Sequence, residues 1–88
     1  MDYEVKHDEA ARRFYVETDG ETGYAEYVVK DGALDVIHTI VPKAIGGRGI
    51  AAAVVEAAYR YARRAGLRPE ATCPYAAVWL QRHPFETL

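Results

Sequence analysis

The chain has 88 residues, of which 50% are hydrophobic, and this predicts one small folded domain over residues 1–88 rather than a disordered segment. Its formal net charge of −2 argues against non-specific nucleic-acid binding, and no apolar run approaches the ~20 residues that cross a membrane. The single cysteine, Cys73, excludes an internal disulfide framework. Because residues 1–13 are also charged throughout, unlike a signal peptide, we expect a cytoplasmic protein.

Three short strands are expected in the first part of the chain. Residues 3–6 alternate as a short edge strand, and residues 12–18 alternate as a half-buried strand. Residues 23–30 form a third candidate rich in tyrosine and valine. Asp-Gly pairs at 19–20 and 31–32 are strong hairpin signals on either side of it, so we predict an antiparallel meander.

A fourth strand is expected over residues 33–41, ending at Pro42. Strict alternation would place the even-numbered residues on one apolar face: Leu34, Val36, His38 and Ile40. The odd-numbered residues, Thr39 among them, would lie on the other face. A glycine-rich loop follows this strand.

A long alanine-rich helix is expected over residues 49–65. Spacings of three and four give it one apolar stripe: Ile50, Val54, Ala57, Tyr61 and Ala65. Glu56 and Arg60 form a favourable pair one turn apart, and Gly66 is the expected C-terminal cap.

The remaining chain adds a strand and a short helix. Residues 67–72 follow a helix directly, so this strand should run parallel to the fourth. Cys73 precedes Pro74, which suits the first position of a helix that ends before Pro84. The order β-β-β-β-α-β-α predicts an α/β domain of the α+β type. It has a mixed, largely antiparallel sheet with both helices packed on it.

The loop Gly46-Gly47-Arg48-Gly49 is the strongest local signal for a ligand. Glycines let a ligand approach the backbone, and the first turn of the helix leaves N–H groups without partners. These N–H groups and the helix dipole suit a phosphate or pyrophosphate, and Arg48 supports an anion nearby. A tight turn that binds nothing is the alternative interpretation.

These segments together resemble the acetyl-CoA-binding motif of the GNAT superfamily of N-acetyltransferases, and most closely its small stand-alone branch. The resemblance spans about residues 24–85. The pieces that carry it are His38-Thr39, Val41-Pro42, Gly46-Gly47-Arg48-Gly49-Ile50-Ala51, Tyr61-Ala62-Arg63, Cys73-Pro74-Tyr75 and Arg82-His83-Pro84. It implies a compact GNAT-like fold with acetyl-CoA, or CoA, as cosubstrate.

The resemblance also implies how CoA would bind. Backbone groups of Thr39, Ile40 and Val41 would hold the pantetheine arm, and an N–H near Ile40 would polarise the thioester carbonyl. The backbone of the glycine loop and of the first helical turn, Gly46, Gly47, Arg48, Gly49, Ile50, Ala51 and Ala52, would hold the pyrophosphate. Arg82 and His83 would reach the adenosine phosphates, or only cap their helix.

Two departures from the superfamily pattern concern single positions. The loop usually begins with glutamine or arginine where this chain has Gly46, so one anion-facing side chain is missing. The close branch often has an acidic residue where this chain has Ile40. The helices that usually shape the acceptor pocket are absent too.

Three side chains are candidates for the chemistry. His38 would act as a base, or be a satisfied histidine on the apolar face. Cys73 stands before a helix, where a dipole favours the thiolate, and would accept the acetyl group; the alternative is a buried, inert cysteine. Tyr75 would donate a proton or pack on CoA.

We therefore expect an acetyl-CoA-dependent N-acetyltransferase that acts on an unidentified amine, on a protein or a polyamine. A non-catalytic CoA-binding or protein-interaction module is the alternative, and a purely structural domain is the third. His7 and His83 show no ligand spacing with other residues, so no metal is expected. A monomer and a homodimer both remain open.

Overall fold

The computed structural model describes residues 3–88, so residues 1 and 2 of the expected domain lie outside it. The elements in chain order are β1 (Lys6–Asp8), β2 (Arg13–Thr18), β3 (Glu21–Lys30), β4 (Ala33–Ile40), the short 3-10 helix η1 (Lys43–Ile45), α1 (Ile50–Ala65), β5 (Arg68–Ala71), α2 (Pro74–Arg82) and the 3-10 helix η2 (Phe85–Thr87). Within residues 3–88, neither α-helix is long and apolar enough to cross a membrane.

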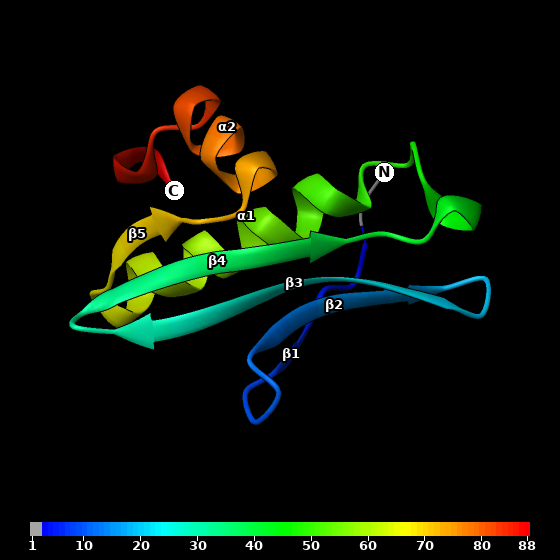
Figure 1. Cartoon of the computed structure of the whole chain (residues 1–88), viewed down its shortest axis with the longest axis horizontal. Coiled ribbons are helices and arrows are strands. Elements are labelled where there is room, and N and C mark those ends of the chain that lie inside the picture. Colours follow the sequence, from blue (N-terminus) through cyan, green and yellow to red (C-terminus); the bar gives the residue numbers. More distant parts are fainter. Residues whose placement is uncertain (1–2) are drawn as a thin grey trace.

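The five strands form one mixed sheet in the order β1-β2-β3-β4-β5 (Figure 1). The first four strands pair antiparallel, and β5 pairs parallel to β4. This arrangement confirms the predicted fold class. The first strand was misplaced, because β1 begins only at Lys6 and pairs with residues 13–15 of β2. The turn after β1, in which the Asp8 carboxylate accepts from the N–H of Ala11 at 3.1 Å, fixes this later register.

Both predicted Asp-Gly turns are present. Asp19 and Gly20 have φ values of 52° and 74°, and Asp31 and Gly32 have φ values of 54° and 77°. Two consecutive positive φ angles are typical of a type I′ turn, whose twist matches that of the flanking strands. The two turns set the β2–β3 and β3–β4 hairpins.

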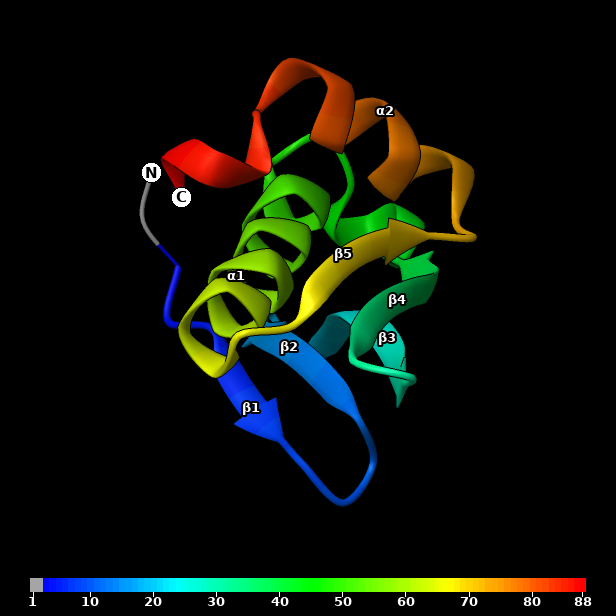
Figure 2. The same cartoon turned by 90° about the vertical axis from the view of Figure 1, so that its left-hand side faces the viewer.

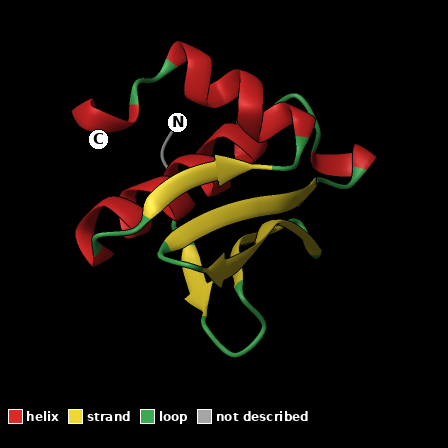
Figure 3. Cartoon of the chain, turned by 60° about the vertical axis from the view of Figure 1, so that its left-hand side comes forward, coloured by secondary structure: helices red, strands yellow, loops and turns green. Residues whose placement is uncertain are grey.

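Both helices lie on the same side of the sheet (Figures 2 and 3). Helix α1 contacts β2, β3, β4 and β5, and α2 packs beside β5 and α1. The Tyr59 ring of α1 stacks on the Trp79 ring of α2, with centroids 6.1 Å apart. The opposite face of the sheet carries no helix in the described part of the chain.

The predicted apolar stripe of α1 was only partly right. Ile50 and Val54 are buried, but the rest of the buried face is formed by Val55, Ala58, Tyr59 and Ala62. Ala57 and Tyr61 are half-buried, and Ala65 is exposed. The face turns because α1 packs on the sheet along one side and on α2 along the other, so two partners widen and shift the buried stripe.

Strand β3 lets the start of α1 approach closely at Gly23. A Cβ built at Gly23 would lie 2.8 Å from Cγ2 of Ile50 and 3.4 Å from Cγ2 of Val41. Real Cβ atoms essentially never come this near, so any other residue at this position would have to displace the buried Ile50 side chain. This contact fixes the first residue of α1, and with it the glycine loop, against the sheet.

A β-bulge interrupts β4 and changes which face its side chains take. His38 pairs with Glu26, whereas Val36 pairs with Tyr27, so Ile37 is an extra residue in β4. Beyond the bulge Thr39 pairs with the fully buried Ala25 and therefore faces the helices.

The bulge corrects the expected position of His38. The His38 side chain lies on the open face of the sheet and is exposed, as is Ile40 at 48%. The interpretation of His38 as a satisfied histidine on the apolar face was wrong, because one inserted residue reverses the alternation.

Stability should fall at alkaline pH through Tyr59. Burial raises the pKa of its phenol, which donates a 2.6 Å hydrogen bond to the Glu70 carbonyl oxygen, and Asp35 adds to the shift. The folded state therefore holds the proton more tightly than the unfolded chain, whose tyrosine pKa is about 10. We expect the free energy of unfolding to decrease as the pH rises above about 10. Tyr59→Phe should weaken this decrease, measured by urea unfolding at pH 9 and at pH 11; an unchanged decrease would contradict the assignment.

Candidate functional site

Strands β4 and β5 separate halfway along β4 and leave an open edge. Their pairing ends at Val36 and Ala71, and the last link is a 3.0 Å hydrogen bond from the Cys73 N–H to the Val36 carbonyl. Strand β4 continues to Ile40, while the chain after β5 turns away into α2 (Figure 1). Backbone groups at the end of β4 are therefore free to pair with an extended ligand on this side.

The glycine loop leads from this edge to α1. Gly46 is extended and its N–H donates to the Lys43 carbonyl at 3.1 Å, which removes it from the expected anion cradle. Gly47 and Gly49 have φ values of 73° and 83°, so each sits in the conformation that favours glycine. Among the described residues, no backbone carbonyl accepts from the N–H of Gly47, Arg48 or Gly49.

The first turn of α1 adds further free donors. Its cap, Gly49, makes no side-chain hydrogen bond, and the first intrahelical bond runs from the Ala53 N–H to the Gly49 carbonyl at 3.1 Å. The N–H groups of Ile50, Ala51 and Ala52 therefore have no acceptor within the helix. Ile50 itself is buried and anchors this turn. A Cβ built at Gly49 meets nothing within 4 Å, so space is open beside the cap.

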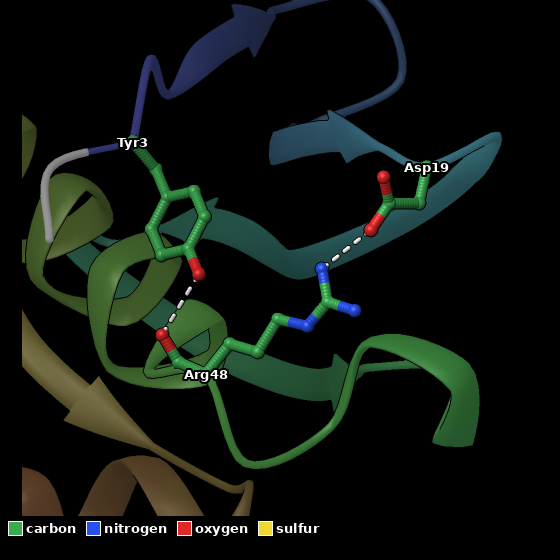
Figure 4. A network of polar contacts seen from close by, with 3 residues as sticks. All are labelled: Tyr3, Asp19 and Arg48. Atoms are coloured by element: carbon green, nitrogen blue, oxygen red, sulfur yellow. Dashed lines mark hydrogen bonds and ion pairs between the residues drawn. The ribbon is translucent and has the colours of Figure 1, made fainter.

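Two distant residues hold Arg48 (Figure 4). Its guanidinium Nη1 donates to the Asp19 carboxylate at 2.5 Å, and its carbonyl oxygen accepts from the Tyr3 hydroxyl at 2.9 Å. The hydrogen bond to Asp19 and the charge of this carboxylate raise the pKa of Arg48. In this conformation the Arg48 cation faces the β2–β3 turn.

Cys73 caps the N-terminus of α2 at the point where the strands separate. It is 6% exposed, and its Sγ lies 3.4 Å from the Thr39 hydroxyl oxygen. The pair therefore lies on the helix side of the sheet, whereas His38 lies on the open face. The structure does not bring the candidate base and the candidate nucleophile together.

A cleft of about 260 Å³ separates α1 from α2. Four of its lining residues are among those that the resemblance assigned to CoA: Ala52, Tyr75, Arg82 and His83. Its other lining residues are Glu56, Val78 and Trp79. Tyr75 and Val78 remain 43% and 46% exposed. Burial raises the pKa of the Tyr75 phenol, and the nearby Arg82 partly offsets this, so the neutral phenol is favoured.

His83 is fixed at one rim of this cleft. Its ring stacks on Trp79 with centroids 4.3 Å apart, and its Nδ1 lies 2.9 Å from the Trp79 carbonyl oxygen. Because a carbonyl only accepts, Nδ1 carries the proton and donates. The Nδ1 contact caps the end of α2, and the Nε2 atom of His83 makes no hydrogen bond to another described residue.

A larger hollow of about 490 Å³ lies on another flank of α1, beside Tyr3 and Val5. Of the residues that the sequence assigned to a ligand, it contains only Gly49 and Ala52. The cleft between the two helices brings more of these residues together, and we take it as the candidate site. Across residues 3–88, no group of three or more His, Cys, Asp or Glu side chains forms a possible metal site.

The chain is similar to known proteins of one family. A family model described as GCN5-related N-acetyl-transferase matches residues 13–88. The chain belongs to this acetyltransferase family. Protein NATD1 from Xenopus tropicalis is 36% identical over 84 residues, which are 91% of this chain and 76% of that protein. The human NATD1 is also 36% identical over 84 residues, 91% of this chain and 74% of its own length.

A solved structure of the same family has the same fold. It is the NMR structure of a GCN5-like protein from Staphylococcus aureus, described as a candidate N-acetyltransferase. The two chains superimpose with a TM-score of 0.71 at 25% identity, covering 96% of this chain and 84% of the other. The resemblance to the GNAT superfamily is confirmed. The individual roles of His38, Cys73 and Tyr75 stay predictions.

The sequence did not point to Tyr3, Asp19 or Glu56 as parts of this region. Tyr3 and Asp19 contact Arg48 across 45 and 29 residues of sequence, so no local spacing could reveal them. Glu56 lines the cleft while its carboxylate pairs with Arg60 at 2.7 Å. The expected helical pair is therefore confirmed, and it lies at the edge of the site.

Proposed function

We propose that this domain transfers the acetyl group of acetyl-CoA to an amine. The observation that carries the proposal is the combination of three features around the start of α1 and of α2. These are the open edge at the end of β4, the glycine loop with free N–H groups, and the cleft between α1 and α2. They would accept an extended amide-containing arm, an anion and an aromatic nucleotide in that order, and CoA carries these three parts.

The loop and the cleft fit the polar end of CoA. The N–H groups of Gly47, Arg48 and Gly49 and the first turn of α1 would receive the pyrophosphate. In the cleft, Arg82 and the free Nε2 of His83 offer a cation and a hydrogen-bonding group for a phosphate or ribose.

The open edge of β4 fits the pantetheine arm. Its two amide groups would pair with backbone groups of Thr39, Ile40 and Val41, as an added strand would. The Tyr75 side chain and Val78 would cover the arm from α2. A backbone N–H near Ile40 would then donate to the thioester oxygen as negative charge develops on it.

Direct transfer is the chemistry that this arrangement favours. The amine nitrogen forms a bond to the thioester carbon, and the carbon–sulfur bond breaks. The electron pair stays on the CoA sulfur, which takes up a proton, and the amine releases one. Cys73 is 6% exposed, so an acetyl-cysteine intermediate would first need a rearrangement around its thiol.

The amine would approach from the open face of the sheet. His38 lies on that face at the end of β4 and is exposed, so it would accept the proton of an incoming amine. No helix covers this face in residues 3–88, which favours an amine on an accessible chain, such as a polyamine or a protein side chain.

Turnover with defined amines tests the proposal. Wild type, His38→Ala and Cys73→Ala would be incubated with acetyl-CoA and spermidine or a lysine peptide, and acetylated product would be measured by mass spectrometry. Direct transfer predicts product with wild type, little change in Cys73→Ala, and a kcat lower by about 100-fold or more in His38→Ala. Loss of product in Cys73→Ala, with an acetyl group found on wild-type Cys73, would instead support the covalent route.

A non-catalytic CoA-binding module is the second candidate. One observation favours it: the two candidate catalytic side chains lie on opposite faces of the sheet. His38 lies on the open face, and Cys73 is buried on the helix side. Binding of acetyl-CoA without turnover of any amine would support this candidate. Failure to bind CoA would favour a purely structural domain.

A further inference from the structure

Tyr3 contacts the glycine loop from outside the region that resembles the superfamily. Its hydroxyl donates a 2.9 Å hydrogen bond to the backbone carbonyl oxygen of Arg48, in the middle of the loop (Figure 4). The residue lies 45 positions before Arg48 and belongs to no strand or helix. The Tyr3 ring is half-buried and packs against the edge of the core, whereas its hydroxyl makes this hydrogen bond at the exposed surface.

The acceptor of this hydrogen bond is the peptide unit between Arg48 and Gly49. Peptide bonds are planar, and in a trans unit the C=O and the following N–H point in opposite directions. No peptide bond between residues 3 and 88 is cis. A carbonyl held toward Tyr3 therefore aims the Gly49 N–H away from Tyr3.

This peptide unit needs a restraint of this kind. Gly47 and Gly49 both have positive φ, and glycine reaches both signs of φ at little cost. A coupled rotation about Arg48 ψ and Gly49 φ would reverse the peptide and turn its carbonyl toward an anion. The side-chain ion pair of Arg48 with Asp19, on the β2–β3 turn, limits the same rotation from a second direction.

We propose that Tyr3 is a positioning residue of the anion cradle: its hydroxyl locks the Arg48–Gly49 peptide so that the Gly49 N–H faces the bound pyrophosphate. This inference rests on the proposed binding of acetyl-CoA. It adds the N-terminal segment to the binding machinery. It also predicts that removal of the Tyr3 hydroxyl lowers the affinity only for ligands that carry a pyrophosphate, because the pantetheine arm would lie along β4.

Tyr3→Phe removes this one hydroxyl and keeps the ring. We expect the Kd for acetyl-CoA to rise by about 3- to 10-fold, since one hydrogen bond no longer pre-orders the loop. The Kd for S-acetylpantetheine, which lacks the pyrophosphate, should not change. Tyr15→Phe is the matched control, because Tyr15 lies on the open face of the sheet away from the loop.

NMR of the ligand-free protein measures the conformation of the loop directly, through the backbone amide signal of Gly49. In free Tyr3→Phe we expect the Gly49 amide signal to shift and to broaden by exchange, while it stays unchanged in Tyr15→Phe. An unaltered Gly49 signal, or equal losses of affinity for acetyl-CoA and S-acetylpantetheine, would overturn the inference. Absence of acetyl-CoA binding in wild type would instead overturn the proposed function, and the ligand-free signal would still decide whether Tyr3 locks the peptide.

Discussion

Gly49→Leu is expected to reduce acetyl-CoA binding by at least about 10-fold. The new side chain would stand on the loop whose backbone N–H groups are proposed to hold the pyrophosphate, and a Cβ there meets no other atom within 4 Å. It would also strain the loop, since Gly49 has a φ of 83° and L-residues in this region cost about 1–2 kcal/mol. Affinity would be measured by calorimetric titration on the folded variant.

Gly66 offers a matched control at the other end of the same helix. It has a φ of 74°, and a Cβ built there also meets nothing within 4 Å. Gly66→Leu therefore carries a similar backbone strain, but far from the loop. Equal losses of acetyl-CoA affinity in the two variants, or full affinity in Gly49→Leu, would show that the loop backbone is not the anion site.

Trp79→Ala should strongly decrease the free energy of unfolding of this chain. Trp79 is 6% exposed, and its ring stacks with those of Tyr59 of α1 and of His83. Removing a buried tryptophan costs about 3–5 kcal/mol, a large part of the 5–15 kcal/mol that stabilises a typical domain. For a domain of this size we expect the melting temperature to fall by more than about 12 °C.

Val78→Ala is the control for that variant, because Val78 neighbours Trp79 on α2 and is 46% exposed. Its melting temperature should stay within about 4 °C of wild type. Trp79→Phe, which keeps an aromatic ring against Tyr59, should recover much of the loss. A small change in the melting temperature of Trp79→Ala would mean that α2 contributes little to the core. Helix α2 would then not form a fixed wall of the cleft.

Turns and helix ends could be predicted from the sequence because their signals are local. The Asp-Gly pairs at residues 19–20 and 31–32 adopt the positive φ values that such turns require. Gly49 and Gly66 cap α1 at both ends in the left-handed conformation. Pro74 begins α2 directly after Cys73, as its missing N–H allows. The parallel pairing of β5 followed from the helix that precedes it.

The faces of β4 could not be predicted, because one residue decides them. Ile37 is inserted into the β3–β4 ladder, and every side chain after it changes sides. Nothing in the apolar alternation of residues 33–41 marks this position. The consequence for the site is large, since His38 leaves the apolar face and Thr39 turns toward Cys73.

The contacts that restrain the glycine loop could not be predicted from the sequence either. The loop was expected to bind an anion from its glycines and its place before a helix, and the free N–H groups agree with that. Arg48 supported the prediction of an anion near the start of the helix. Its actual partners, Asp19 and Tyr3, come from a hairpin turn and an irregular segment that only the folded chain brings near.

Calorimetric titration of the wild-type domain with acetyl-CoA tests the central claim most directly. The account predicts saturable binding of one acetyl-CoA per chain and weaker binding of S-acetylpantetheine, because the pyrophosphate contributes through the loop. No heat of binding up to millimolar acetyl-CoA, or equal affinity for the two ligands, would contradict the proposed site.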